Sequence, residues 1–185
     1  MTLRASQLEL MRDLVGRGET RPLSWRLDQL NRLRALVEEH EQELLTALAS
    51  DLGKPQTEAF FEVVTLLQET KQTVKNLHRW MRPRSVPLPL TQQPGRASVV
   101  PEPLGCVLII GPWNLPFALT LQPLISALAA GNTAVLKPSE HSPAVSALIT
   151  KACAHHFDSD VVTVVEGDGR VAADLVAMPF DHIFF

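Results

Sequence analysis

Two polar clusters in this chain have residue types and spacing that could do chemistry. In the first, residues 111–117, Asn114 lies between two prolines and follows the apolar run at residues 106–110. Prolines restrict the backbone, and an amide N–H held in place can donate to an oxyanion that develops during a reaction. Because Asn is also a favoured helix N-cap, the residues alone leave Asn114 open to either role.

The second cluster contains Lys137 and Glu140 and follows the apolar run at residues 133–136. A carboxylate just beyond a strand can accept from both ribose hydroxyls of a dinucleotide, as the acidic residue of dinucleotide-binding folds does, and Lys137 could donate to the same sugar. For a Lys-Pro-Ser-Glu motif taken alone, a surface ion pair is the more common outcome.

A third candidate is the turn that contains Gly167 and Gly169. Glycine lets a ligand approach the backbone, and free N–H groups at a helix start attract phosphate, although a plain turn is the more common explanation of a lone Gly-x-Gly. The chain has no Gly-x-Gly-x-x-Gly motif. A nucleotide must therefore be held differently from the usual phosphate loop, or not at all.

The cysteines and histidines give no catalytic or metal site. Cys106 lies inside an apolar run, where a thiol behaves as a small hydrophobic group. Cys153, His155 and His156 could in principle ligate a metal, but no fourth ligand is near them in the sequence, so we predict no metal site. His182 alternates with apolar residues and is expected to be a packed strand histidine.

The N-terminal elements expected around these residues are helices. Apolar residues recur at helical spacing from residue 3 to about residue 82, with a break near His40 and a Gly-Lys-Pro stop signal at residues 53–55. A long helix is predicted from about Gln56 to Trp80. Its expected inward residues are Phe60, Val63, Val64, Leu67, Val74 and Leu77.

Two further segments follow. Prolines favour an extended arm over residues 83–103, with a short edge strand at residues 97–100. Strands and helices then alternate with short turns, which predicts an α/β fold with a parallel, doubly wound sheet and right-handed crossovers. The expected strands are residues 106–110, 133–136, 161–165 and 181–185, and the expected helices are residues 117–130, 143–157 and 169–178. The predicted domains are therefore residues 1–82, 83–103 and 104–185.

Composition excludes several classes of partner. The 185 residues carry a net charge of −3 and no basic block, so nucleic acid is not expected. No apolar run approaches the ~20 residues of a membrane span. The polar N-terminus is unlike a secretory signal, and two cysteines far apart suggest reduced thiols and a cytoplasmic protein.

Taken together, the motifs resemble those of the aldehyde dehydrogenase superfamily, and the resemblance covers essentially the whole chain. DLGKP at residues 51–55 and FDHIFF at residues 180–185 are similar to the class-three branch, which acts on fatty and aromatic aldehydes. The motifs that carry the superfamily resemblance are EPLGCVLIIGPWNLPF at 102–117, QP at 122–123, AAGN at 129–132 and LKPSE at 136–140.

The resemblance implies roles for individual residues. Asn114 matches the amide that stabilises the oxyanion of a thiohemiacetal, and Lys137 and Glu140 match the pair that contacts the adenosine ribose of NAD or NADP. Glu140 would favour NAD, although this branch often accepts both cofactors. Residues 83–103 match part of an oligomerisation arm, which implies a homodimer. The remaining implied cofactor residues are Ile110, Gly111, Pro112 and Trp113, which line the cleft, and Gly167 and Gly169 near the adenine.

The chain also departs from the family pattern. No residue matches the nucleophilic cysteine or the general-base glutamate, and a thiolate must attack the aldehyde in this chemistry. We therefore expect the N-terminal part of an enzyme that oxidises aldehydes to carboxylic acids, without activity as an isolated 185-residue chain. The apolar strand at residues 181–185 is expected to be exposed, which predicts poor solubility or a partner.

Two other readings remain. A truncated paralogue could act as a non-catalytic binding or assembly module, and the gene sequence past codon 185 would distinguish it from an enzyme. An acyl-phosphate reductase of related architecture is a third possibility, which the dipeptide Trp113-Asn114 disfavours.

Overall fold

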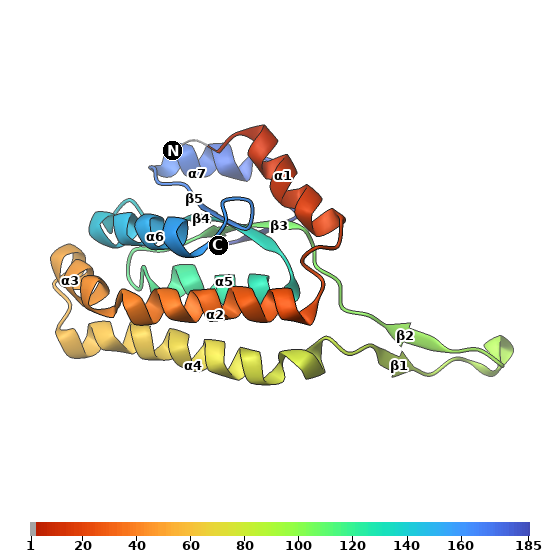
Figure 1. The fold of residues 1–185 in the computed structure, drawn as a ribbon. Coiled ribbons are helices and arrows are strands. Elements are labelled where there is room, and N and C mark those ends of the chain that lie inside the picture. Colours follow the sequence, from red (N-terminus) through yellow and green to blue (C-terminus); the bar gives the residue numbers. More distant parts are fainter. Residues whose placement is uncertain (1–2) are drawn as a thin grey trace.

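A four-stranded parallel sheet organises the computed structural model, which describes residues 3–185 (Figure 1). The order in the sheet is β5-β4-β3-β6, so β3 and β4 lie at its centre. This arrangement confirms the α/β fold expected from the alternating elements. The strands are β3 (Cys106–Ile110), β4 (Thr133–Lys137), β5 (Val162–Val164) and β6 (His182–Phe184).

The central strand β3 is buried on both faces, because its side chains alternate between two cores. Cys106 and Leu108 belong to one hydrophobic cluster, whereas Val107 and Ile109 belong to the other. Successive side chains of a strand point to opposite faces, so a continuous apolar run is what a strand covered on both sides requires. Helices therefore cover each face of this sheet.

The first face is covered by α1 (Ala5–Gly16) and α7 (Gly169–Val176) (Figure 1). Leu8 and Met11 of α1 are buried in the same cluster as Cys106 of the sheet. Helix α1 therefore packs on the face opposite the other N-terminal helices, and the division of the chain at residues 82 and 103 stays a prediction.

The second face carries a thicker helical layer with one continuous core. Helices α5 and α6 lie against the sheet, and α2, α3 and α4 pack outside them (Figure 1). These helices are α2 (Leu23–Glu39), α3 (Glu41–Leu52), α4 (Gln56–Trp80), α5 (Ala118–Ala130) and α6 (Pro143–His156). The helical layer and the sheet therefore share a hydrophobic core.

The helix boundaries near His40 and Gly53 confirm the expected break and stop. His40 lies between α2 and α3, and Gly53 ends α3 in the left-handed conformation with φ of 62°, which glycine adopts readily. The inward face expected for α4 is wrong at one position: Phe60 is exposed, whereas Ala59 and Val63 are buried. The buried stripe passes through Ala59, so Phe60, one residue further around the helix, turns towards solvent.

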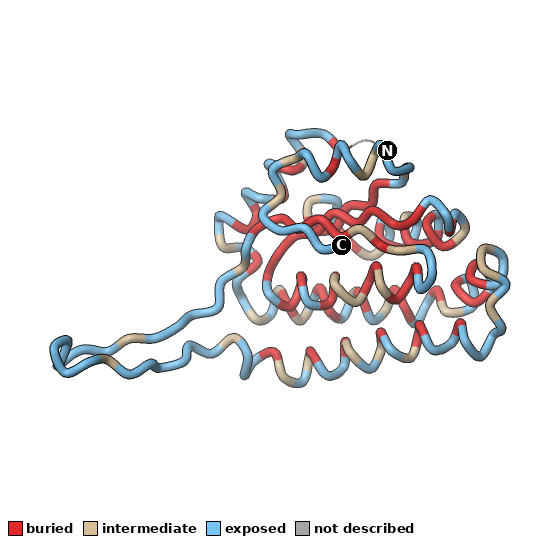
Figure 2. Tube along the Cα trace, turned by 180° about the vertical axis from the view of Figure 1, so that it is seen from behind, coloured by how far each residue is buried: buried red, intermediate tan, exposed pale blue. Residues whose placement is uncertain are grey.

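The proline-rich segment at residues 83–103 forms an arm that projects from the rest of the molecule (Figure 1). Strands β1 (Arg84–Val86) and β2 (Ala97–Val99) pair antiparallel, and the short helix η1 (Leu90–Gln92) lies between them. No residue of the arm is buried (Figure 2). Of the helices in the described part of the chain, none is long and apolar enough to cross a membrane.

Candidate functional site

The two polar clusters meet at one edge of the sheet, where β3 and β4 end. The strands are in register at Ile110 and Lys137, and the Gly111 N–H donates to the Lys137 carbonyl at 2.9 Å. The Ser142 hydroxyl donates to the Trp113 carbonyl at 3.1 Å. The turn at residues 111–117 is therefore held against the loop between β4 and α6, as the parallel strand order predicted.

Lys137 and Glu140 form an ion pair that is buried on one side and open on the other. Lys137 is 2% exposed, and its Nζ donates to Glu140 Oε2 at 2.7 Å and to the Pro138 carbonyl at 3.2 Å. About a third of the Glu140 side chain, 34%, is exposed. The hydrogen bond from Lys137 lowers the pKa of the Glu140 carboxyl, so this group is charged at neutral pH.

This pair has the donor and acceptor capacity that a sugar diol needs. An ammonium group has three N–H donors, and the two bonds of Lys137 within the protein leave one available. A carboxylate has two acceptor oxygens, and the Glu140 side chain is 34% exposed, so it can still accept from a ligand. The ribose contact that the resemblance implied for these two residues stays a prediction.

Asn114 is exposed at the end of β3 and does not cap the following helix. Helix α5 begins at Ala118, and its first N–H groups are bound by a carboxylate from α4. Glu62 Oε2 accepts from the N–H groups of Phe117 at 3.1 Å and of Ala118 at 2.9 Å. The capping alternative for Asn114 is therefore removed, because Glu62 occupies that role, and the Asn114 amide remains exposed.

Sequence reasoning missed Glu62. Its side chain is 2% exposed, and its other oxygen, Oε1, accepts from Lys54 Nζ at 2.6 Å. A buried carboxylate requires such partners, because an unpaired charge is costly to bury. The available signal was a glutamate on the stripe of α4 that also contains Ala59 and Val63.

The segment that contains Lys54 also caps α6, the second helix that starts at the site. Asp51 Oδ1 accepts from the Ala144 N–H at 3.1 Å, and Asp51 Oδ2 accepts from the Val145 N–H at 2.9 Å. The motif DLGKP at residues 51–55 therefore supplies the cap of α6 through Asp51 and the cation that pairs with the cap of α5 through Lys54. Both helix starts are tied to the outer helical layer.

The third strand end is occupied by a helix cap. Asp168 Oδ1 accepts from the N–H groups of Arg170 at 3.0 Å and of Val171 at 3.3 Å. A Cβ on Gly167 would lie 2.6 Å from the Val171 Cβ, so the packing of α7 needs glycine there. The proximity of Gly167 and Gly169 to an adenine stays a prediction.

Neither cysteine is suited to nucleophilic attack. Burial raises the pKa of the Cys106 thiol to about 11 and that of the Cys153 thiol to about 12, so both are neutral at physiological pH. Cys106 also starts β3, at the sheet edge opposite Asn114. The thiolate nucleophile that aldehyde oxidation requires is absent from these residues.

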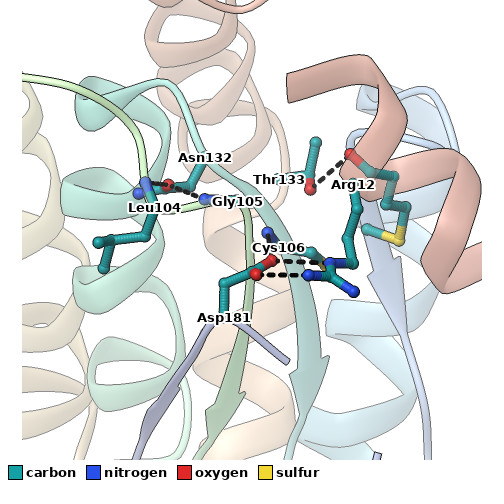
Figure 3. Close-up of polar contacts among 8 residues, drawn as sticks. Arg12, Leu104, Gly105, Cys106, Asn132, Thr133 and Asp181 are labelled. Atoms are coloured by element: carbon teal, nitrogen blue, oxygen red, sulfur yellow. Dashed lines mark hydrogen bonds and ion pairs between the residues drawn. The ribbon is translucent and has the colours of Figure 1, made fainter. Parts of the chain in front are cut away.

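Polar groups at that opposite edge fix the starts of the strands (Figure 3). Asn132 Oδ1 accepts from the Gly105 N–H at 3.0 Å. Asp181 accepts from the Cys106 N–H at 2.8 Å and pairs with Arg12 at 2.8 Å. A Cβ on Gly105 would overlap the Asp181 carboxylate. This network aligns β3 with β6.

The fold and this edge define a class: an open parallel α/β sheet with polar groups at the carboxyl ends of its strands, where dinucleotides bind in such folds. Within that class, residues 16–185 match the model of the aldehyde dehydrogenase family. The chain belongs to the aldehyde dehydrogenase family.

Individual relatives agree with the branch expected from the motifs. The chain is 44% identical to aldehyde dehydrogenase family 3 member H1 of Arabidopsis thaliana over 91% of its own length and 35% of the relative. It is 39% identical to family 3 member A2 of Macaca fascicularis over 97% of its length and 37% of that relative. The chain therefore spans about a third of the length of these curated relatives.

A solved structure gives the same fold. The substrate-bound state of Staphylococcus aureus AldH superposes with a TM-score of 0.95 at 35% sequence identity, over 100% of this chain and 41% of that one. The α/β fold assigned from the sheet order is therefore the aldehyde dehydrogenase fold.

Proposed function

We propose that this chain is the N-terminal part of an NAD(P)-dependent aldehyde dehydrogenase that oxidises aldehydes to carboxylic acids through a cysteine thioester. The observation that carries the proposal is that the Lys137–Glu140 pair and the exposed amide of Asn114 lie at one edge of the sheet. The pair that would hold the cofactor and the amide that would stabilise the oxyanion therefore belong to one site.

Each residue has a separate task in this proposal. Lys137 donates to the adenosine ribose and Glu140 accepts from its hydroxyls, while Ile110 and Trp113 line the cleft. When bound, the dinucleotide supplies the hydride acceptor. Asn114 donates its amide N–H to the oxygen that becomes negative after thiolate attack, which lowers the barrier most if the donor is fixed beforehand.

The charge of Glu140 also bears on cofactor choice. A carboxylate that accepts from the 2′-hydroxyl would lie close to the 2′-phosphate of NADP, and two anions at that distance repel each other. We therefore propose that NAD is preferred. The partial exposure of the Glu140 side chain leaves it room to turn aside, which would permit NADP as a weaker cofactor.

The test is a dehydrogenase assay on two purified proteins: the product of the whole gene and the isolated 185-residue chain. Aldehyde-dependent reduction of NAD is expected from the first and not from the second, because both cysteines of the chain are buried and neutral. Turnover of a long-chain aldehyde by the isolated chain would contradict the proposal.

A non-catalytic binding module is the alternative function, and the exposed apolar strand β6 favours it. The same assay separates the two functions, because a module would leave the product of the whole gene without aldehyde-dependent NAD reduction.

We also propose that the arm joins two copies of the complete protein in a homodimer. It projects from the body and exposes Leu90, Val99 and Val100, which a second copy would cover. Light scattering on the product of the whole gene should give a dimer, and Leu90→Asp should shift it towards monomer.

A further inference from the structure

A cluster of ionisable groups lies where the ends of α2 and α6 meet, and the proposed function does not use it. Glu39 comes from the last residue of α2, and His155 and His156 come from the last two residues of α6. One potential ligand atom of each residue lies within 4.8 Å of those of the other two. Since α6 starts at the candidate site and has 14 residues, this cluster is about 20 Å away from that site.

The His156 side chain is largely buried, and one of its ring nitrogens has no hydrogen bond. Its side chain is 9% exposed, and its Nε2 has no hydrogen-bond partner among the described residues 3–185. Glu39 Oε2 lies 3.3 Å from this nitrogen, but it is not placed to form a hydrogen bond with it. A buried ring nitrogen without a partner needs an explanation, such as a bound ion.

A second histidine nitrogen beside the cluster has the same property. His40 is buried, and its Nε2 has no partner within the described part of the chain. The rings of His40 and His156 meet edge to face, with centroids 5.8 Å apart. Two unsatisfied nitrogens in one place are expected where a polar ligand and its ordered water belong.

The distance between His156 and Glu39 agrees with that between two ligands of a tetrahedral ion. Zinc bonds of about 2.0–2.1 Å place neighbouring ligand atoms about 3.3–3.4 Å apart. Two ligands of one ion direct their lone pairs at the metal and not at each other, so they lie close together without a hydrogen bond. The contact between His156 and Glu39, at 3.3 Å, has this character.

We propose that Glu39, His155 and His156 bind a zinc ion, with water as the fourth ligand. The set of two imidazoles and one carboxylate is chemically suited to zinc. Glu39 and His155 are exposed, which provides a path for the metal to enter. The ion would join α2 to α6 and so stabilise the packing of the helical layer on the sheet.

The third ligand comes from a part of the chain far from the two histidines. The sequence pointed to Cys153 as the companion of these histidines, but its thiol is buried in the core. The fold supplies Glu39, more than a hundred residues earlier in the chain, in its place.

The experiment is a zinc titration of the metal-free protein, made from the whole gene, against a chromophoric chelator. One zinc ion per chain is expected, and Glu39→Gln, His155→Gln and His156→Gln should each weaken binding by at least about 10–100-fold, the loss seen when even an indirect partner of a metal is removed. His78→Gln, an exposed histidine of α4, is the matched control and should bind zinc as the unaltered protein does.

Thermal unfolding provides a second readout that does not depend on dehydrogenase activity. Zinc should raise the Tm of the unaltered protein and of His78→Gln, because it binds only the folded state, and should not raise the Tm of Glu39→Gln or His155→Gln. Both of those side chains are exposed, so these variants should fold normally. Absence of zinc binding, or a zinc site that survives both substitutions, would overturn the proposal.

Discussion

At the scale of single residues, the site is defined by groups whose burial and exposure differ sharply. Lys137 is buried while its partner Glu140 is partly exposed, so the ion pair is held in place and still offers an acceptor to a ligand. Asn114 is exposed on a turn whose carbonyl at Trp113 is anchored by Ser142. The side chains that would touch cofactor and substrate therefore sit on a restrained backbone.

Replacing Asn114 by Ala should lower kcat of the complete enzyme by about 10²–10³-fold, the usual loss when one oxyanion donor is removed. The KM for NAD should change little, because the amide acts on the reacting oxygen. Steady-state kinetics measures both, with Asn76→Ala on α4 as a control that lies outside the site. An unchanged kcat would rule out the oxyanion role.

The affinity for NAD should be constant through neutral pH and fall only in acid. The hydrogen bond from Lys137 lowers the folded-state pKa of Glu140. The Glu140 carboxylate therefore stays charged through neutral pH, and its capacity to accept from the ribose is lost only as the pH falls through this lowered pKa. Calorimetric titrations of NAD at several pH values would measure this, and Glu140→Gln should bind more weakly without that acid decline.

At the scale of elements, carboxylates from the outer helical layer hold the helices that begin at the site. Glu62 of α4 caps α5, and Asp51 of α3 caps α6. Negative groups at helix N-termini satisfy free N–H groups and interact favourably with the helix dipole. The position of the turn that carries Asn114 therefore depends on packing between α4 and α5.

Replacing Glu62 by Ala should destabilise the protein by about 3–5 kcal/mol, because it leaves the Lys54 ammonium, whose side chain is 13% exposed, and the N–H groups of Phe117 and Ala118 without partners. Urea unfolding measures this loss. Glu58→Ala, at an exposed position of the same helix, should change stability by no more than about 0.5 kcal/mol.

A second variant tests the explanation. The double substitution Lys54→Met and Glu62→Gln should recover part of the lost stability, since it removes the buried charge and keeps an amide oxygen as acceptor. Equal effects of Glu62→Ala and Glu58→Ala would show that the buried ion pair does not contribute.

At the scale of the whole molecule, the outer strand β6 of the sheet is exposed. Strand β6 pairs only with β3 among the described residues, and all three of its residues are exposed. A groove of about 430 Å³ beside it is lined by Val107, Ile109 and Phe184. The expected exposure of this strand is therefore confirmed.

This exposed strand should make the isolated 185-residue chain self-associate, and Phe184→Lys should reduce that association by placing a charge on the edge. Light scattering at increasing concentration measures it. Val176→Lys on α7 is the matched control, since Val176 is 49% and Phe184 47% exposed. Equal association of the two variants would contradict a role for β6.

Local patterns predicted most of the elements, because secondary structure depends on short-range periodicity. The apolar run bounded by glycines marked β3 at its observed limits, and the glycine and proline signals marked the end of α3. Phe60 was wrongly predicted to face inward. Which of two adjacent apolar residues of a helix is buried depends on the helices that pack against it. The position of α1 depends on the same long-range packing.

By itself, the sequence determined the order of strands and helices, the family, and the meeting of the Asn114 turn with the Lys137–Glu140 pair, because consecutive parallel strands end at the same edge. Only the tertiary structure decided that Glu62 caps α5 and that Glu39 meets His156. These partners are distant in the chain and come together only because whole helices pack against each other. The spacing of neighbouring residues in the sequence does not predict such contacts.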